Sequence, residues 1–120
     1  MKNKDTKAEL RFREILVNYF EDFETHARDL PGTPDIVLRQ NAVCVFVNGC
    51  YWHGHQCSKT YKDGQYKWST SAIETQQRDK KVISQLEALG FRSFVVWECA
   101  SNSQMDKIAS AIRAYCRKNL

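Results

Sequence analysis

Three side chains that could hold a metal ion lie together in one loop, directly after an apolar stretch. Cys50, His55 and Cys57 are spaced as C-x4-H-x-C. Thiolates and imidazoles are preferred zinc ligands, and a tetrahedral site needs a fourth one from elsewhere. Cys99 is the best candidate because it lies just past a second apolar stretch, whose end a mixed sheet could place beside the end of the first. We therefore expect a structural zinc ion, with a loop of incidental thiols and imidazoles as the alternative interpretation.

A histidine and an aspartate near this loop could act on a substrate. His53 lies inside the loop without being needed for zinc, and an imidazole can serve as a general base near neutral pH. Asp35 follows Pro34 before a short apolar stretch, which is the first half of the PD-(D/E)xK nuclease pattern. Carboxylates in that pattern hold magnesium on a phosphodiester. The second half is absent, and a packing histidine and a simple Pro-Asp turn are the alternative interpretations.

Helices are expected in three places around these residues. Apolar residues recur at helical spacing from about Lys7 to Phe20, and Thr6 with Glu9 has the pattern of a capping box. The Glu9 carboxylate therefore caps this helix, binds a metal, or does both, and the pattern leaves these open. A long amphipathic helix is expected at about residues 71–89, ended by Gly90, and a closing helix at 104–117.

Apolar stretches predict the strands of a sheet at residues 35–38, 42–47 and 91–97, with a weak edge strand at 23–27. The stretch 42–47 is apolar throughout, so it should be the central strand. The order helix, hairpin, helix, strand, helix predicts an α/β fold with a mixed central sheet flanked by helices. Residues 1–120 are expected to form a single domain.

The mildly basic composition suits an intracellular protein that binds a polyanion. The net charge is +4, which is mildly basic. No apolar run is long enough to span a membrane, and the first residues lack a signal-peptide core, so a cytoplasmic location is expected. Five cysteines then favour metal binding or buried thiols over disulfides. Cys44 should be a small buried apolar residue, and Cys116 has no assigned role.

Four segments in one order resemble the very short patch repair (Vsr) endonucleases. They are LPGTPDIVL, VFVNGCYWHGHQC, Arg78-Asp79 and LGFRSFVVWEC, and the resemblance runs from about Glu9 to Cys99. It implies a restriction-endonuclease-like core with a structural zinc site. It also implies magnesium-dependent nicking of double-stranded DNA, with T·G mismatches as the target.

The resemblance also implies roles for individual residues. Asp35 would bind magnesium together with the backbone carbonyl of Val47, His53 would be the catalytic histidine, and Glu9 would lie near a second metal. The implied zinc ligands are Cys50, His55, Cys57 and Cys99. The implied DNA contacts are aromatic wedges and lysines, for which packing around the loop and plain solvation are the alternatives: Tyr51, Trp52, Trp68, Lys59, Lys62 and Lys67.

Three departures from the family pattern favour the nuclease chemistry over mismatch recognition. Asn48 stands where the family usually has a histidine, little chain precedes the first helix, and residues 57–79 lack much of the usual basic pattern. One alternative is therefore the catalytic domain of a homing or restriction-type endonuclease, with specificity supplied by another module or a repair partner. A zinc-stabilised DNA-binding module without catalysis is the other. We expect a monomer.

Overall fold

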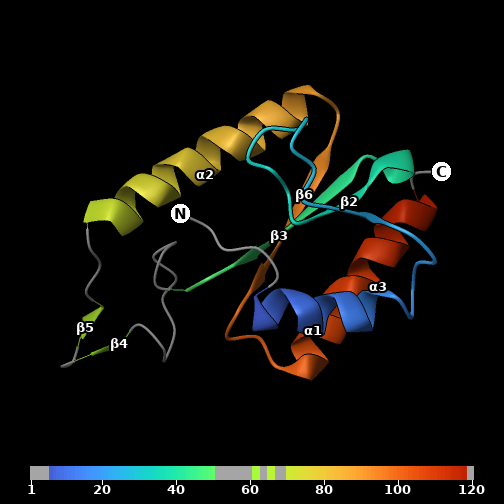
Figure 1. Ribbon diagram of the computed structural model, residues 1–120, viewed down its shortest axis with the longest axis horizontal. Coiled ribbons are helices and arrows are strands. Elements are labelled where there is room, and N and C mark those ends of the chain that lie inside the picture. The colour runs from blue at the N-terminus through green and yellow to red at the C-terminus, as the bar shows by residue number, and fades with distance from the viewer. Residues whose placement is uncertain (1–5, 51–60, 63–64, 67–69, 119–120) are drawn as a thin grey trace.

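The computed structural model describes residues 6–50, 61–62, 65–66 and 70–118, and within these the chain forms three layers. A mixed sheet of four strands has helix α2 on one face and helices α1 and α3 on the other (Figure 1). The helices are α1 (Lys7–Leu16), α2 (Thr70–Ala88) and α3 (Asn102–Lys118). The predicted α/β class, with a mixed central sheet flanked by helices, is confirmed.

The sheet has the strand order β1-β2-β3-β6. Its strands are β1 (Glu24–Thr25), β2 (Ile36–Leu38), β3 (Val43–Asn48) and β6 (Arg92–Trp97). β2 pairs with both β1 and β3 in antiparallel fashion, and the short helix η1 (Arg39–Asn41) joins β2 to β3. β3 and β6 are parallel and are connected through α2. A separate small hairpin consists of β4 (Tyr61–Lys62) and β5 (Gln65–Tyr66).

β3 is the central strand, as its apolar composition predicts. All of its residues are buried, because both faces of the sheet are covered. Alternate side chains, including Val45 and Val47, pack into the cluster formed with α1 and α3. Cys44 and Phe46 pack into a second cluster, against Leu86 of α2. Cys44 is therefore a buried apolar residue, and burial raises the pKa of its thiol to about 11.

Helix α1 ends at Leu16, earlier than the predicted end at Phe20. Beyond Leu16 the N–H of Asn18 and the N–H of Tyr19 donate to carbonyls three residues back, as in a tightened last turn. Tyr19 and Phe20 still pack against the cluster under α1 and α3. The apolar spacing continues past the helix because the turn covers the same core.

Two glycines with positive φ offer a matched test of packing between the α2 layer and the sheet. A Cβ on Gly32 (φ 75) would lie 2.5 Å from Val82 Cγ1 and 3.3 Å from Phe46 Cε1, whereas one on Gly90 (φ 89) would meet no described atom within 4 Å. Gly90→Ala should cost about 1–2 kcal/mol of unfolding free energy for the backbone alone. Gly32→Ala should cost about 2–4 kcal/mol, because crowding adds to the same backbone strain.

Urea unfolding of the two variants measures this difference. Adding Val82→Ala to Gly32→Ala should recover part of the loss by opening space. Equal losses in the two glycine variants would contradict the proposed contact between Gly32 and α2.

Candidate active site

The candidate site lies at one edge of the sheet, where β3 and β6 end and β2 begins. Because β3 and β6 are parallel, Asn48 and Trp97 are paired at this edge. The N–H of Glu98 donates to the Asn48 carbonyl at 3.0 Å, which extends the pairing past the end of β6. Asp35 directly precedes the antiparallel strand β2, so it lies beside the end of β3.

Asp35 is bound to the end of β3 through a backbone amide. Its Oδ2 accepts the N–H of Val47 at 2.7 Å, and the residue is only 2% exposed. N–H and C=O groups of one strand residue point to the same side, so the Val47 carbonyl also faces β2. Pro34 would lie opposite Val47 if the register continued, and proline has no N–H to donate. Pro34 therefore cannot donate to the Val47 carbonyl, and this carbonyl is directed toward Asp35.

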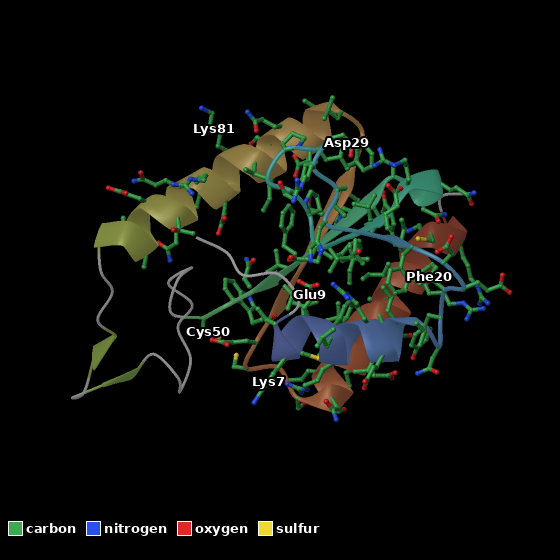
Figure 2. The ribbon with its side chains drawn as sticks, viewed as in Figure 1. Lys7, Glu9, Phe20, Asp29, Cys50 and Lys81 are labelled. Carbon is green, nitrogen blue, oxygen red and sulfur yellow. The ribbon has the colours of Figure 1, made fainter. Side chains whose placement is uncertain are left out.

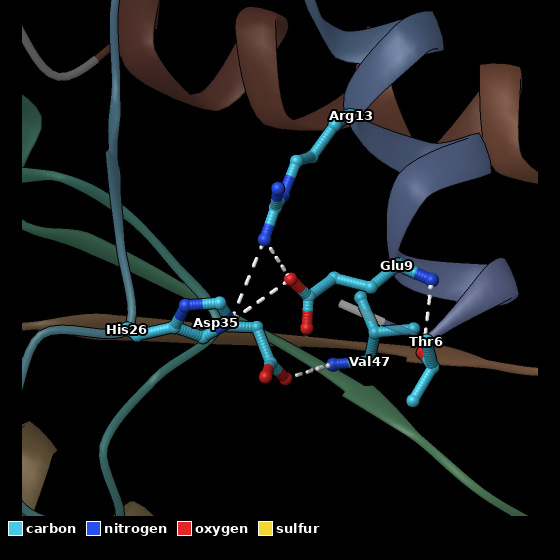
Figure 3. A network of polar contacts seen from close by, with 6 residues as sticks. All are labelled: Thr6, Glu9, Arg13, His26, Asp35 and Val47. Atoms are coloured by element: carbon cyan, nitrogen blue, oxygen red, sulfur yellow. Dashed lines mark hydrogen bonds and ion pairs between the residues drawn. The ribbon is translucent and has the colours of Figure 1, made fainter. Parts of the chain in front are cut away.

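Glu9 reaches the same place from the first turn of α1. The Thr6 Oγ1 accepts the Glu9 N–H at 3.2 Å, so Thr6 is the N-cap, as the capping-box pattern predicts. The Glu9 carboxylate is 1% exposed and points toward Asp35 and His26 (Figure 3). In Figure 2 Glu9 lies on the sheet side of α1 and Lys7 on the opposite side. The Glu9 side chain therefore lies beside Asp35 and His26, and its role in the site stays a prediction.

His26 completes the cluster and is a residue that the sequence analysis missed. Its Nε2 lies 2.9 Å from Glu9 Oε2. Its backbone N–H donates to the carbonyl of Asp35 at 3.1 Å, just beyond β1, so the two residues face each other across the β1–β2 pairing. The sequence did hold a signal for it. If the predicted edge strand 23–27 is paired antiparallel with the strand 35–38, His26 falls opposite Asp35.

Positive charge is also present in this cluster. The guanidinium of Arg13, one turn along α1, binds Glu9 Oε2, and its Nη2 lies 3.5 Å from His26 Nε2. The pKa of Glu9 is nevertheless raised above its ordinary 4.5. Burial is the largest cause, followed by the negative charge of Asp35 and a hydrogen bond with it; Arg13 and His26 act in the opposite direction.

The donor atoms of the cluster fit a divalent cation. One ligand atom each from Glu9, His26 and Asp35 lies within 4.8 Å of the others. Carboxylate and carbonyl oxygens are the ligands of magnesium and manganese, and imidazole suits transition metals. In addition, the Asn48 Oδ1, next to Val47, is buried and has no hydrogen-bond partner among the described residues. A buried acceptor needs a donor or a cation, which is compatible with a hydrated metal ion at this edge.

The proposed zinc corner lies at the same edge, and part of it is described. Cys50 follows the end of β3 and is buried, whereas Cys99 follows β6 and is partly exposed. The Cys50 N–H donates to the Glu98 carboxylate at 2.9 Å, which joins the two chain segments. The prediction that the ends of these two strands lie side by side is confirmed. His55 and Cys57 lie outside the described residues, so the complete ligand set stays a prediction.

Most of the predicted DNA-contacting residues also lie outside the described part of the chain, together with the catalytic candidate His53. They are Tyr51, Trp52, Lys59, Lys67 and Trp68. Lys62 belongs to β4, but its side chain is not described. Lys80 and Lys81 are exposed on α2. Among the described helices, none is both long and apolar enough to cross a bilayer.

Buried carboxylates at the edge of a mixed sheet flanked by helices are consistent with a nuclease of the restriction-endonuclease-like class. The family model described as DNA mismatch endonuclease Vsr matches residues 1–59. The type II nicking enzyme V.XorIIP of Xanthomonas oryzae pv. oryzae is 38% identical over 101 residues, which cover 82% of this chain and 74% of that protein. V.NmeAIP of Neisseria meningitidis is 34% identical over 122 residues, covering 98% and 79%.

A third relative is the DNA mismatch endonuclease Vsr of Escherichia coli, 34% identical over 99 residues that cover 81% of this chain and 64% of that protein. The chain belongs to the Vsr family. It is a DNA endonuclease that resembles the very short patch repair nickases. The alternative of a DNA-binding module without catalysis is therefore set aside.

The raised pKa of Glu9 predicts how the stability of the protein changes with pH when no divalent cation is added. The folded protein keeps a proton on Glu9 that the unfolded chain releases above its ordinary pKa of 4.5. The stabilisation is fully present below 4.5 and is lost as the pH rises through the raised pKa. Glu9→Gln should therefore reduce the fall in unfolding free energy between pH 4.5 and pH 8.

The measurement is urea unfolding at a series of pH values, with Glu14→Gln, an exposed carboxylate of the same helix, as the control. Glu14→Gln should keep the pH dependence of the parent protein. A Glu9→Gln profile parallel to that of the parent would show that Glu9 titrates normally.

Proposed function

We propose that the protein is a magnesium-dependent endonuclease that nicks one strand of double-stranded DNA, with T·G mismatches as its preferred target. The observation that carries this proposal is the convergence of the Asp35 carboxylate, the Val47 backbone and the Glu9 carboxylate at one sheet edge. It is supported by the names of relatives, which include a DNA mismatch endonuclease and type II nicking enzymes.

In this mechanism Asp35 and Val47 would hold the metal ion at the position of the scissile phosphate. Asp35 and the Val47 carbonyl would bind the ion, and the 2.7 Å bond from the Val47 N–H keeps the carboxylate in position for it. A bound magnesium ion supplies the positive charge that stabilises the phosphodiester during hydrolysis. Glu9 would add negative charge beside a second metal position. His53 would take the proton from the attacking water.

Recognition of DNA is assigned to the loop that follows β3. Tyr51, Trp52 and Trp68 would unstack the duplex beside the mismatch, since apolar wedges kink a base step at a cost of a few kcal/mol. Lys59, Lys62 and Lys67 would contact phosphates, which positions the duplex without reading its sequence. We further propose that residues 1–120 act as one domain and as a monomer.

A structural zinc ion is proposed to hold this loop. Cys50, His55, Cys57 and Cys99 would be its ligands. The contacts that support this proposal are the Glu98 N–H bonded to the Asn48 carbonyl and the Glu98 carboxylate bonded to the Cys50 N–H. These bonds join the ends of β3 and β6, so an ion held at this corner would also stabilise the strand end that carries Val47.

The endonuclease proposal is tested by nicking of labelled duplexes that differ only in a T·G mismatch or a T·A pair. With magnesium the parent protein should nick the T·G strand preferentially. Asp35→Asn should lower the rate by at least about a hundredfold, because the magnesium ion that stabilises the transition-state charge would lose its charged ligand. Asp29→Asn is the matched control, since Asp29 is 63% exposed and pairs with Arg39 away from the site.

Equal cleavage of the T·G and T·A duplexes would instead indicate a catalytic domain whose specificity comes from another module. The departures from the family pattern, of which Asn48 in place of the usual histidine is one, favour this second candidate. Asp35→Asn cleaving as fast as the parent would overturn the mechanism itself.

The zinc proposal has a separate test. Metal analysis of purified protein should find about one zinc ion per chain, and Cys57→Ala should lose the ion together with several degrees of melting temperature, because a structural site contributes to folding. Cys116→Ala is the control for the loss of a buried thiol outside the site. Cys57→Ala that retains both zinc and melting temperature would show that the ligand set is wrong.

A further inference from the structure

Of the three potential metal ligands Glu9, His26 and Asp35, His26 is the one that the proposed mechanism does not use. Its Nε2 lies 2.9 Å from Glu9 Oε2. Neighbouring ligands of an octahedral ion with bonds of about 2.1 Å are about 3.0 Å apart. The Glu9 oxygen and the His26 nitrogen therefore already have the separation of two adjacent ligands of one ion. Asp35 supplies a third donor atom within 4.8 Å of both.

The backbone of His26 directs its imidazole into the cluster. His26 has φ of 52°, in the left-handed region, which is unfavourable for a residue with a side chain. The preceding strand residues, Glu24 and Thr25, are exposed, whereas the His26 side chain is only 14% exposed. Strained backbone of this kind is concentrated at functional sites. The residue with this backbone places an imidazole 2.9 Å from a buried carboxylate.

Arg13 marks the position that a cation would take. Its guanidinium binds the same Glu9 Oε2 that faces His26, with Nη2 3.5 Å from the His26 nitrogen. A metal ion that bridges Glu9 and His26 would occupy this space. Because two positive charges cannot share one carboxylate oxygen without repulsion, the metal and the Arg13 guanidinium should compete.

We propose that Glu9, His26 and Asp35 bind one divalent ion of the first transition series, manganese(II) in preference to magnesium, and that this ion displaces the Arg13 guanidinium from Glu9. The proposal rests on the proposed function in that the catalytic metal and this ion share Asp35. Imidazole is the donor that separates the two metals, since magnesium takes oxygen ligands and water. Asn48 Oδ1, buried at the same edge, is available to a water of the ion.

The test is manganese(II) binding to the full chain without DNA, followed by electron paramagnetic resonance. One equivalent of zinc is added first, which fills the thiolate site and leaves the carboxylate–imidazole cluster for manganese. His26→Asn is the decisive variant, because asparagine adopts the left-handed conformation readily and offers an oxygen in place of the imidazole nitrogen. It should weaken manganese binding by about tenfold or more while changing magnesium affinity much less.

Arg13→Met should tighten manganese binding several-fold by removing the competing charge. Arg11→Met is its matched control on the same helix, because Arg11 binds Asn102 and the Ala100 carbonyl. The control should bind manganese as the parent does. Circular dichroism and melting temperature establish that each variant is folded.

Pulsed measurements of nitrogen coupling to the bound manganese give a readout on the parent protein itself. A nitrogen coupling that His26→Asn abolishes supports the proposal. Absence of the coupling in the parent, its persistence in His26→Asn, or equal manganese affinity of the two proteins would overturn the ligand role. Weaker binding by Arg13→Met would overturn the displacement.

These outcomes are separate from those of the nicking assay. If the protein nicks DNA with magnesium but His26→Asn leaves its manganese affinity unchanged, the proposed function stands and this inference is wrong. If manganese binding depends on His26 but the protein nicks no duplex, this inference stands and the proposed function is wrong.

Discussion

The site depends on the bond between the Asp35 carboxylate and the Val47 N–H. This bond, 2.7 Å long, is made where the β2–β3 ladder reaches Pro34 and can no longer continue. β3 is buried on both faces and paired on both sides, so its end has little freedom. Asp35 is therefore held in place by the whole core. A buried carboxylate that lacked such a donor would be costly.

The second constraint is the concentration of charge in a small buried space. Glu9 and Asp35 are both almost fully buried and in contact, and two carboxylates in this position repel each other. A proton on Glu9, the guanidinium of Arg13 and a divalent cation each relieve the same repulsion. The raised pKa of Glu9, the position of Arg13 and the proposed metal site are thus three consequences of one arrangement. In the proposed site His26 would select among cations because its donor atom is nitrogen.

Much of this arrangement could be predicted from the sequence, and what was missed has physical causes. The central strand was predicted because residues 42–47 are apolar at every position, and the hairpin placed Asp35 beside its end. His26 was missed because its place depends on pairing across a turn and on a left-handed backbone. The early end of α1 at Leu16 was missed because the following turn packs on the same core. The ion pair of Glu9 with Arg13 has the (i, i+4) spacing that a helix predicts, but the approach of Arg13 to His26 requires side-chain directions that spacing alone does not specify.

The most direct test of the account is a crystal structure of the full chain grown with manganese(II), with the metal located by anomalous scattering. The account predicts one manganese peak at the edge of the sheet, about 2 Å from carboxylate oxygens of Asp35 and Glu9 and from His26 Nε2, with the Arg13 guanidinium moved away from Glu9. Electron density in which Asp35 and Glu9 lie apart, or a metal bound elsewhere while these carboxylates keep only Arg13 and Val47 as partners, would contradict it.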